Sequence, residues 1–211
     1  MIRTVIVFLI VVCAFNLQAQ QLTTIRLNAP NKTRGTALMQ AFNDRQSIRE
    51  YSSERIRPQD LSDLLWAAYG INRADGRRTA PSTRNLLAVE MYVLLPEGAY
   101  HYNAAEHALD PVAAGDFRAA AAATQDFART APLNIVLVAD MNKFGNRSEQ
   151  SLLMAAVDVG VISQNINLAC AGMGLATVTR GTMDQAALRT ALKLTDMHLI
   201  LINNPVGYPV R

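Results

Sequence analysis

The sequence predicts an α+β or α/β sandwich built around a single sheet. Segments with helical apolar spacing alternate with separated apolar segments of strand length. No internal repeat, low-complexity block or linker divides the chain. We therefore expect one domain at 35–211, preceded by a loose polar arm at 20–34 and a targeting segment at 1–19.

The first 19 residues have the pattern of a secretory signal peptide. Arg3 gives a positively charged start, Val5 to Phe15 form a short apolar core, and Ala19 is the small residue expected at the cleavage site. The apolar run is short for a membrane span, and a retained anchor is the alternative. Cleavage after Ala19 removes 19 of 211 residues and the charge of Arg3, which leaves 192 residues and lowers the net charge from +3 to +2. We expect a periplasmic or secreted protein without a stable membrane anchor.

The composition of the mature chain excludes some classes of function. A net charge this small, without a basic stripe interleaved with aromatic residues, does not predict nucleic-acid binding. Cys170 is the one cysteine left after cleavage, so the mature chain has no internal disulfide. Because Cys170 lies in an apolar helical pattern, we interpret it as a buried small residue, with a nucleophile as the alternative.

Helical spacing predicts five helices. Pro58 suits the first turn of the second, and Gly70 ends it. The longest has apolar residues on more than one face, which indicates two neighbours, as in a subunit interface. Gly172 and Gly174 are interpreted as its stop, because a dinucleotide loop needs a strand before its glycines and a helix after them. The five helices are expected at 36–43, 58–70, 116–123, 148–171 and 184–192.

Three strands are predicted from apolar runs. The run at 133–139 is almost continuously apolar, as expected of a central strand. The other two lie at 89–95 and 197–202. Residues 100–102 and 107–112 are interpreted as a short hairpin-like excursion, and 71–85 as a loop.

Arg45, Ser47 and Arg49 occupy alternate positions just after the first predicted helix. In an extended segment alternate side chains point the same way, so the three could converge on one oxygen-rich ligand. Guanidinium groups bind phosphate as forks with permanent charge. The alternative is a solvated basic surface.

Side-chain chemistry is otherwise sparse. His101, His107 and His198 are scattered, and the chain has no HExxH or paired CxxC motif, so no metal site is predicted. It has no GxSxG elbow for a hydrolytic serine. We therefore predict no catalytic side chain, and an enzyme of this sequence would take its chemistry from a cofactor.

An ordered set of motifs along the mature chain resembles the flavin nitroreductase family. The Trp-Ala-Ala-Tyr-Gly and Tyr100-His-Tyr102 pieces are most similar to its thiazole/oxazole-forming dehydrogenase branch. The motifs are Arg45-Gln-Ser-Ile-Arg-Glu-Tyr51, Leu64-Leu-Trp-Ala-Ala-Tyr-Gly70, Arg77-Arg-Thr-Ala-Pro-Ser82 with Asn85, Gln164-Asn165 with Ala169, Gly174-Leu-Ala-Thr177, and Asn204-Pro-Val-Gly-Tyr-Pro209.

The resemblance implies an α+β three-layer sandwich, with a central, mostly antiparallel sheet flanked by helices. It also implies an intertwined homodimer with two FMN molecules at the interface, acting as an FMN-dependent oxidoreductase on a small redox substrate by two-electron ping-pong transfer. The cofactor-binding residues that it implies are Arg45, Gln46, Ser47, Arg49, Pro81, Ser82, Asn85, Arg180, Gly181 and Arg211.

The implied roles differ along the chain. Arg45, Ser47 and Arg49 would hold the phosphate, ribityl chain and pyrimidine edge, and Arg211 would meet the phosphate. Pro81, Ser82 and Asn85 would reach the isoalloxazine from the partner subunit. The backbone at Arg180 and Gly181 would lie along the flavin N5 side.

The sequence also departs from the family pattern. Leu86-Leu87-Ala88 stands where the family often has Gln-Pro-Trp, and the span 103–130 over the expected substrate pocket is short and alanine-rich. Two alternative functions therefore stay open. One is an exported flavin-binding protein without turnover, and the other is an enzyme for an unrelated small molecule that has lost FMN.

Overall fold

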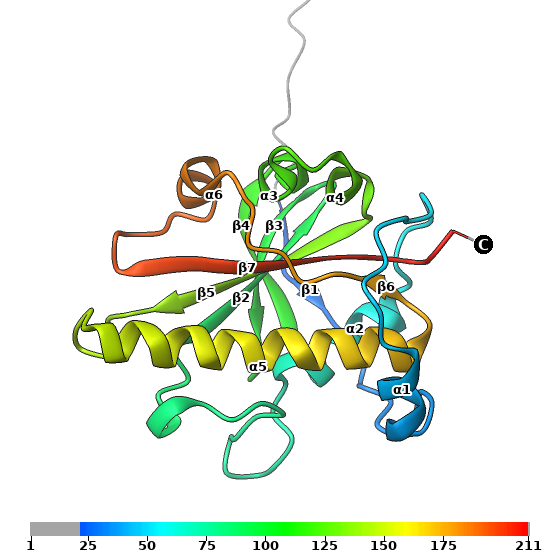
Figure 1. The fold of residues 1–211 in the computed structure, drawn as a ribbon, viewed down its shortest axis with the longest axis horizontal. Coiled ribbons are helices and arrows are strands. Elements are labelled where there is room, and N and C mark those ends of the chain that lie inside the picture. The colour runs from blue at the N-terminus through cyan, green and yellow to red at the C-terminus, as the bar shows by residue number, and fades with distance from the viewer. Residues whose placement is uncertain (1–21, 211) are drawn as a thin grey trace, which may run out of the picture.

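The computed structural model describes residues 22–210, which form three layers (Figure 1). The middle layer is a seven-stranded sheet in the order β1-β4-β3-β2-β5-β7-β6, and every neighbouring pair is antiparallel. The strands are β1 (Ile25–Arg26), β2 (Val89–Leu95), β3 (Gly98–Asn103), β4 (Ala108–Ala114), β5 (Leu133–Asp140), β6 (Ala176–Thr177) and β7 (His198–Gly207). The predicted α+β sandwich is confirmed.

Helices cover both faces of the sheet. On one side lie α1 (Leu38–Asp44), α2 (Pro58–Tyr69) and α5 (Glu149–Met173), and on the other α3 (Arg118–Ala122), α4 (Asp126–Thr130) and α6 (Gln185–Ala191). A short 3-10 turn, η1, covers Thr83–Asn85. The predicted signal peptide and Arg211 lie outside the described residues.

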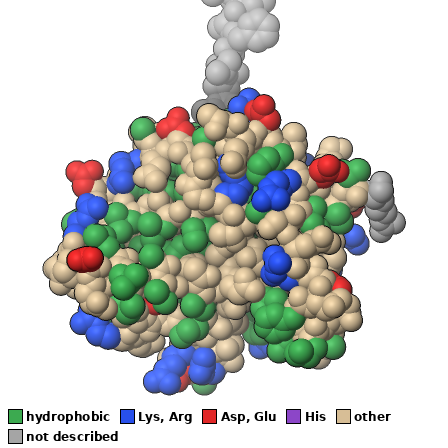
Figure 2. Space-filling view, in the orientation of Figure 1, with side chains coloured by type: hydrophobic (Ala, Val, Ile, Leu, Met, Phe, Trp, Pro, Cys, Tyr) green, Lys and Arg blue, Asp and Glu red, His purple; other side chains and the backbone are tan. Residues whose placement is uncertain are grey.

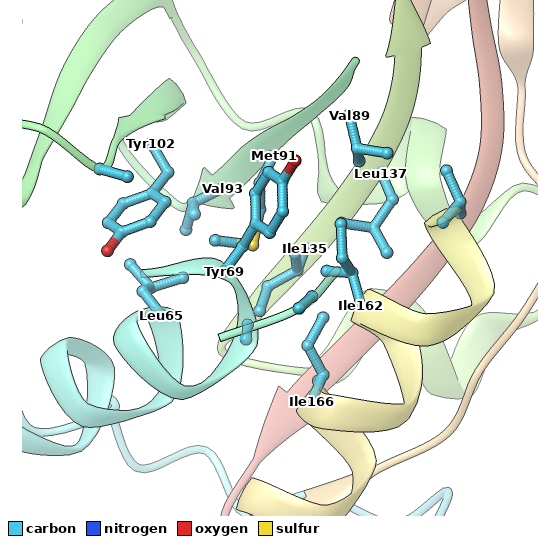
Figure 3. Packing of buried hydrophobic residues seen from close by; sticks show 14 of the residues in the cluster. Leu65, Tyr69, Val89, Met91, Val93, Tyr102, Ile135, Leu137, Ile162 and Ile166 are labelled. Atoms are coloured by element: carbon cyan, nitrogen blue, oxygen red, sulfur yellow. The ribbon is translucent and has the colours of Figure 1, made fainter. Parts of the chain in front are cut away.

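β5 is the central strand that its sequence predicts. Its residues 133–139 are all buried, because both faces of the sheet are covered. Ile135 and Leu137 point to the α2 and α5 side, where Figure 3 shows them with Met91 and Ile162. Val136 and neighbouring apolar residues of the opposite face pack against α3 and α6. The two-residue period of the strand thus supplies two separate cores.

α5 is a core helix with two defined ends. The Ser148 side chain accepts a hydrogen bond from the Ser151 amide at its N-terminus, and Gly174 ends it in the left-handed region at φ 71°. The predicted glycine stop is therefore confirmed. By length and composition alone α5 could cross a membrane, yet Ile162, Ile166 and Cys170 on its inner face are buried against the sheet.

Two regions differ from the sequence prediction. The predicted hairpin-like excursion is instead two full strands, β3 and β4, whose apolar side chains join the core. The described part of the predicted arm, residues 22–34, is not loose: β1 pairs with β4, and the Arg34 guanidinium bonds the buried carboxylates of Asp60 and Asp63 on α2. Helical or strand periodicity does not reveal such a long-range ion pair.

β7 also runs further than predicted, from His198 to Gly207, through two asparagines. The predicted strand ended at residue 202 because polar residues follow it in the sequence. Asn203 and Asn204 are fully buried and their amides are hydrogen-bonded, which lets a strand carry them through the interior.

His107 joins three elements through a buried network. The Ser62 hydroxyl donates to the Asn28 carbonyl, so it accepts from His107 Nε2 at 2.8 Å, and His107 Nδ1 accepts from the Tyr102 hydroxyl at 2.9 Å. This pattern requires a neutral imidazole. Burial lowers the pKa of His107 below its ordinary value of 6.5.

His107 should make stability pH-dependent. Its pKa is lower in the folded than in the unfolded chain, so below about pH 6.5 the unfolded state binds more protons and the free energy of unfolding falls as the pH falls. His107→Asn keeps a residue that tolerates the φ of 45° at this position. We expect the free energy of unfolding of the variant to be about 1 kcal/mol lower at pH 7.5. We also expect it to decline less steeply between pH 7 and 5 than that of the wild type. Urea unfolding across this range measures both, and an unchanged slope would exclude His107 as the source.

Candidate functional site

The segment at 45–49 leaves the end of α1 and crosses beside β6. The Arg45 amide caps α1 on Ala41, and the Ile48 amide donates to the Thr177 carbonyl at 3.0 Å, which fixes the backbone. Arg45, Ser47 and Arg49 are exposed, and no described residue forms an ion pair or hydrogen bond with either guanidinium, although that of Arg49 lies 6.0 Å from the Phe127 ring. Two uncommitted permanent cations and a hydroxyl on an anchored segment fit a phosphate-bearing ligand.

The C-terminal end of the sheet lies against this segment. Tyr51 and Pro209 form an isolated antiparallel bridge, and the Ser52 amide donates to the Tyr208 carbonyl at 2.8 Å. The chain therefore passes the arginine segment just before its last residues. Arg211, predicted to meet the phosphate, lies outside the described residues, so its role stays a prediction.

Pro81, Ser82 and Asn85 form a second cluster, under the other half of α5. They line one cavity of about 270 Å³. Asp158 of α5 holds η1 by accepting from the Thr83 amide at 2.9 Å and the Thr83 hydroxyl at 2.9 Å. The Ser82 hydroxyl accepts from the Leu87 amide at 2.8 Å, and Asn85 has a φ of 57°.

Within one chain the two clusters do not meet. The first lies beyond the end of α5 at Met173, and the second is anchored at Asp158. At 1.5 Å per residue these two points are about 20 Å apart along the helix, and Figure 1 shows the segment after α1 rising beside β6 while the loop between α2 and β2 lies below α5. One protomer therefore does not bring the predicted residues around a single small molecule.

Arg180 is turned into the protein. It is 6% exposed, and its guanidinium donates to the carbonyls of Ala121, Ala122 and Thr182 and to the side chains of Gln125 and Asn203. Burial without a carboxylate partner lowers its pKa, but a guanidinium remains charged. Its side chain fixes α3 and α4 to β7. The sequence predicted that the backbone at Arg180 and Gly181, and not the Arg180 side chain, contacts the cofactor. Burial of the side chain does not test that prediction.

A polar network between α5 and β7 lies close to Arg180, and sequence reasoning missed it. Ser163 bonds Thr179 at 2.8 Å and Asn204 at 2.9 Å, while the Asn167 amide donates to Thr179 at 2.9 Å. Ser163 and Asn167 are one turn apart, four positions along α5. Two polar residues four positions apart in an apolar helix lie on the same face, and this spacing could have indicated the network.

A third group combines carboxylates with a histidine. Glu90, Asp140 and His198 bring potential ligand atoms within 4.8 Å of one another on the α6 side of the sheet. However, the Thr195 amide donates to His198 Nδ1 at 3.2 Å, so in the neutral ring Nε2 carries the proton. A metal on Nε2 would leave the proton of the neutral ring on Nδ1, where the Thr195 amide already donates, so we assign no metal to this group.

Comparisons with known proteins agree with the resemblance seen in the sequence. The model of the nitroreductase family matches residues 43–208. A candidate nitroreductase of Methanocaldococcus jannaschii is 31% identical over 176 residues, which are 77% of this chain and 86% of that protein.

Solved structures share the fold. A candidate nitroreductase of Ralstonia eutropha has 32% identity and a TM-score of 0.82, with 90% of this chain and 91% of that chain covered. The NADPH:FMN oxidoreductase of Vibrio harveyi, solved with NAD+, has 19% identity and a TM-score of 0.63, with 82% and 69% covered, and it supports the fold alone. On the family match and the identity to its relatives, this chain belongs to the nitroreductase family, whose members are generally oxidoreductases.

Proposed function

We propose that this protein is an FMN-dependent oxidoreductase that transfers two electrons by a ping-pong mechanism. Family membership supports the reaction class. The observation that carries the cofactor is the pair of uncommitted guanidinium groups, Arg45 and Arg49, on a segment anchored to β6.

When bound, FMN would supply the redox chemistry, while the protein binds and orients it. Arg45, Gln46, Ser47 and Arg49 would hold the phosphate, ribityl chain and pyrimidine edge. A guanidinium at the pyrimidine edge favours additional negative charge there and so eases reduction. The buried Arg180 guanidinium lies nearby, since the ring of Phe127 is 5.4 Å from the Arg180 guanidinium and 6.0 Å from that of Arg49.

The proposed site is completed by a second copy of the chain. Pro81, Ser82 and Asn85 are held near Asp158, about 20 Å along α5 from the end that adjoins the arginine segment, so they would contribute to the site of the partner. The outward face of α5 supports an interface, because Leu153 and Val157 are 56% and 47% exposed beside the small residues Ala156 and Gly160. At the other end of α5, α1 exposes Leu38, Met39 and Phe42. In a two-fold dimer such patches face each other in pairs.

We also propose export to the periplasm or the exterior through residues 1–19. Reduced nicotinamides are cytoplasmic, so an exported enzyme would use another electron donor or would oxidise its substrate. N-terminal sequencing of the native protein should begin at Gln20 or a near neighbour. An intact Met1 would instead indicate a retained anchor.

FMN affinity should depend on the arginine segment. A charge-assisted hydrogen bond contributes about 1.5–3 kcal/mol, so Arg45→Ala should weaken FMN binding roughly tenfold or more, and Arg45→Ala with Arg49→Ala further. Flavin fluorescence quenching measures the affinity. Arg129→Ala is the matched control, because Arg129 is an exposed arginine of α4 that pairs with Asp126. An unchanged affinity in the double variant would exclude the assignment.

The outward face of α5 should control assembly. Val157→Glu places a charge in the proposed interface, where an unpaired buried charge costs several kcal/mol, so the dimer should weaken about 100-fold or more and lose FMN with it. Light scattering measures the oligomeric state, and a visible spectrum measures the bound FMN. Ala119→Glu, at an exposed position of α3 in the opposite layer, is the control and should neither weaken the dimer nor release FMN. A wild-type monomer that retains FMN at micromolar concentration would contradict the proposal.

Turnover should depend on the flavin and not on a protein nucleophile. Asn85→Ala should slow reaction by disturbing the proposed flavin edge. Cys170→Ala should stay near wild type, because burial raises the pKa of this thiol and keeps it neutral. Stopped-flow reduction of bound FMN by candidate donors, followed by reoxidation with a nitroaromatic, a quinone or oxygen, tests this. A flavin that no acceptor reoxidises at a useful rate would favour a flavin-binding protein without turnover.

A further inference from the structure

The loop after α2 gathers three arginines around one cavity. Ile71 bridges to Arg78, and the Asn72 amide donates to the Arg77 carbonyl at 3.1 Å, so the loop is a closed hairpin-like turn. Gly76 forms its tip at φ 79°. Arg73, Arg77 and Arg78 line the cavity of about 270 Å³ that Pro81, Ser82 and Asn85 also line.

Arg78 carries a buried donor without an acceptor. Its guanidinium stacks on the Tyr69 ring at 4.1 Å, and one Nη donates to the Tyr69 carbonyl at 3.4 Å. Its Nε is buried and has no hydrogen-bond partner among the described residues. An unsatisfied buried donor is costly, while the cavity that Arg78 lines with Arg73 and Arg77 offers charged donors to an anionic oxygen.

The charge around the cavity is mostly positive. Arg73 is positioned by neutral acceptors, the Asn72 side chain at 2.8 Å and the Arg78 carbonyl at 3.0 Å, so its charge is not compensated. Arg77 meets Asp75 at 3.5 Å, but both side chains are more than half exposed, so the pair is weak. Lys143 adds a further cation at the rim by donating to the Leu87 carbonyl at 2.9 Å.

Figure 2 shows Lys and Arg side chains gathered at the lower edge of this face, where Figure 1 places the loop between α2 and β2. The basic surface thus coincides with the mouth of a cavity. A solvated basic loop explains the surface but not the buried Nε of Arg78.

We propose that this cavity binds the anionic group, a carboxylate or a phosphate, of the redox substrate. The inference rests on the proposed function, because Pro81, Ser82 and Asn85 are expected at the flavin ring system. A substrate anion held by Arg73 and Arg77 would place the rest of the molecule beside that ring. The phosphate of FMN is the other possible source of the anion, but Arg45 and Arg49 of the separate cluster already match it.

Benzoate and benzamide are suitable probes, since they differ chiefly in charge and neither is reduced. Calorimetry on the FMN-loaded protein should give tighter binding of benzoate than of benzamide. Arg73→Gln with Arg77→Gln should lower that preference roughly tenfold, the loss expected for a charge-assisted contact. Arg78 is left unchanged because it packs on Tyr69. Arg26→Gln, at a 77% exposed side chain of β1, is the control and should keep the preference.

Each outcome separates the possibilities. Equal binding of benzoate and benzamide to the wild type, or a preference that survives the double variant, would overturn the inference. A double variant that loses FMN affinity while the benzoate preference stays would show that the arginines hold the cofactor phosphate, which also overturns it. If the wild type binds no FMN, the proposed function fails, and the same titration without FMN still decides whether the cavity selects anions.

Discussion

The inner face of α5 packs along the sheet, and this contact sets the separation between the two clusters of predicted cofactor-binding residues. Ile162, Ile166 and Cys170 are buried in the core on the α2 side of the sheet. Asp158 near one end of this face holds η1 with the Pro81 cluster. Beyond the other end, Thr177 holds the arginine segment through the Ile48 amide. The length of one helix therefore sets the separation of two groups of residues that are predicted to act together.

That separation has a functional consequence. A site split between two points about 20 Å apart along α5 would be completed in the proposed dimer, where a two-fold axis reverses the order of the two ends. The exposed apolar residues at both ends of α5 agree with such an arrangement. The upper layer contributes differently: Arg180 ties α3 and α4 to β7 and carries a buried positive charge close to the arginine segment. The Arg45 and Arg49 guanidinium groups are thus exposed, whereas the Arg180 guanidinium is buried and hydrogen-bonded.

Much of the fold could be predicted from the sequence. The apolar run at 133–139 identified the central strand, and the glycine after α5 identified its end, because periodicity and backbone preference are local properties. The hydrogen bonds of Asn203 and Asn204 and the ion pairs of Arg34 join residues far apart in the chain, so local patterns mispredicted β7 and the arm. The alternation of Arg45, Ser47 and Arg49 predicted one half of the proposed site. The sequence did not predict the cavity lined by Arg73, Arg77 and Arg78, because this cavity depends on how the loop at 71–78 folds back over Tyr69.

The central claim is that each cofactor site takes residues from two chains, and mixing two damaged variants tests it most directly. One variant carries Arg45→Ala and Arg49→Ala, and the other Asn85→Ala with Ser82→Ala, so each homodimer has two impaired sites. After the two are dissociated and reassembled together, half of the dimers should be mixed, and each mixed dimer should hold one intact site. The account predicts that tight FMN binding returns at about one FMN per four chains. No recovery in verified mixed dimers would show that each site belongs to a single chain.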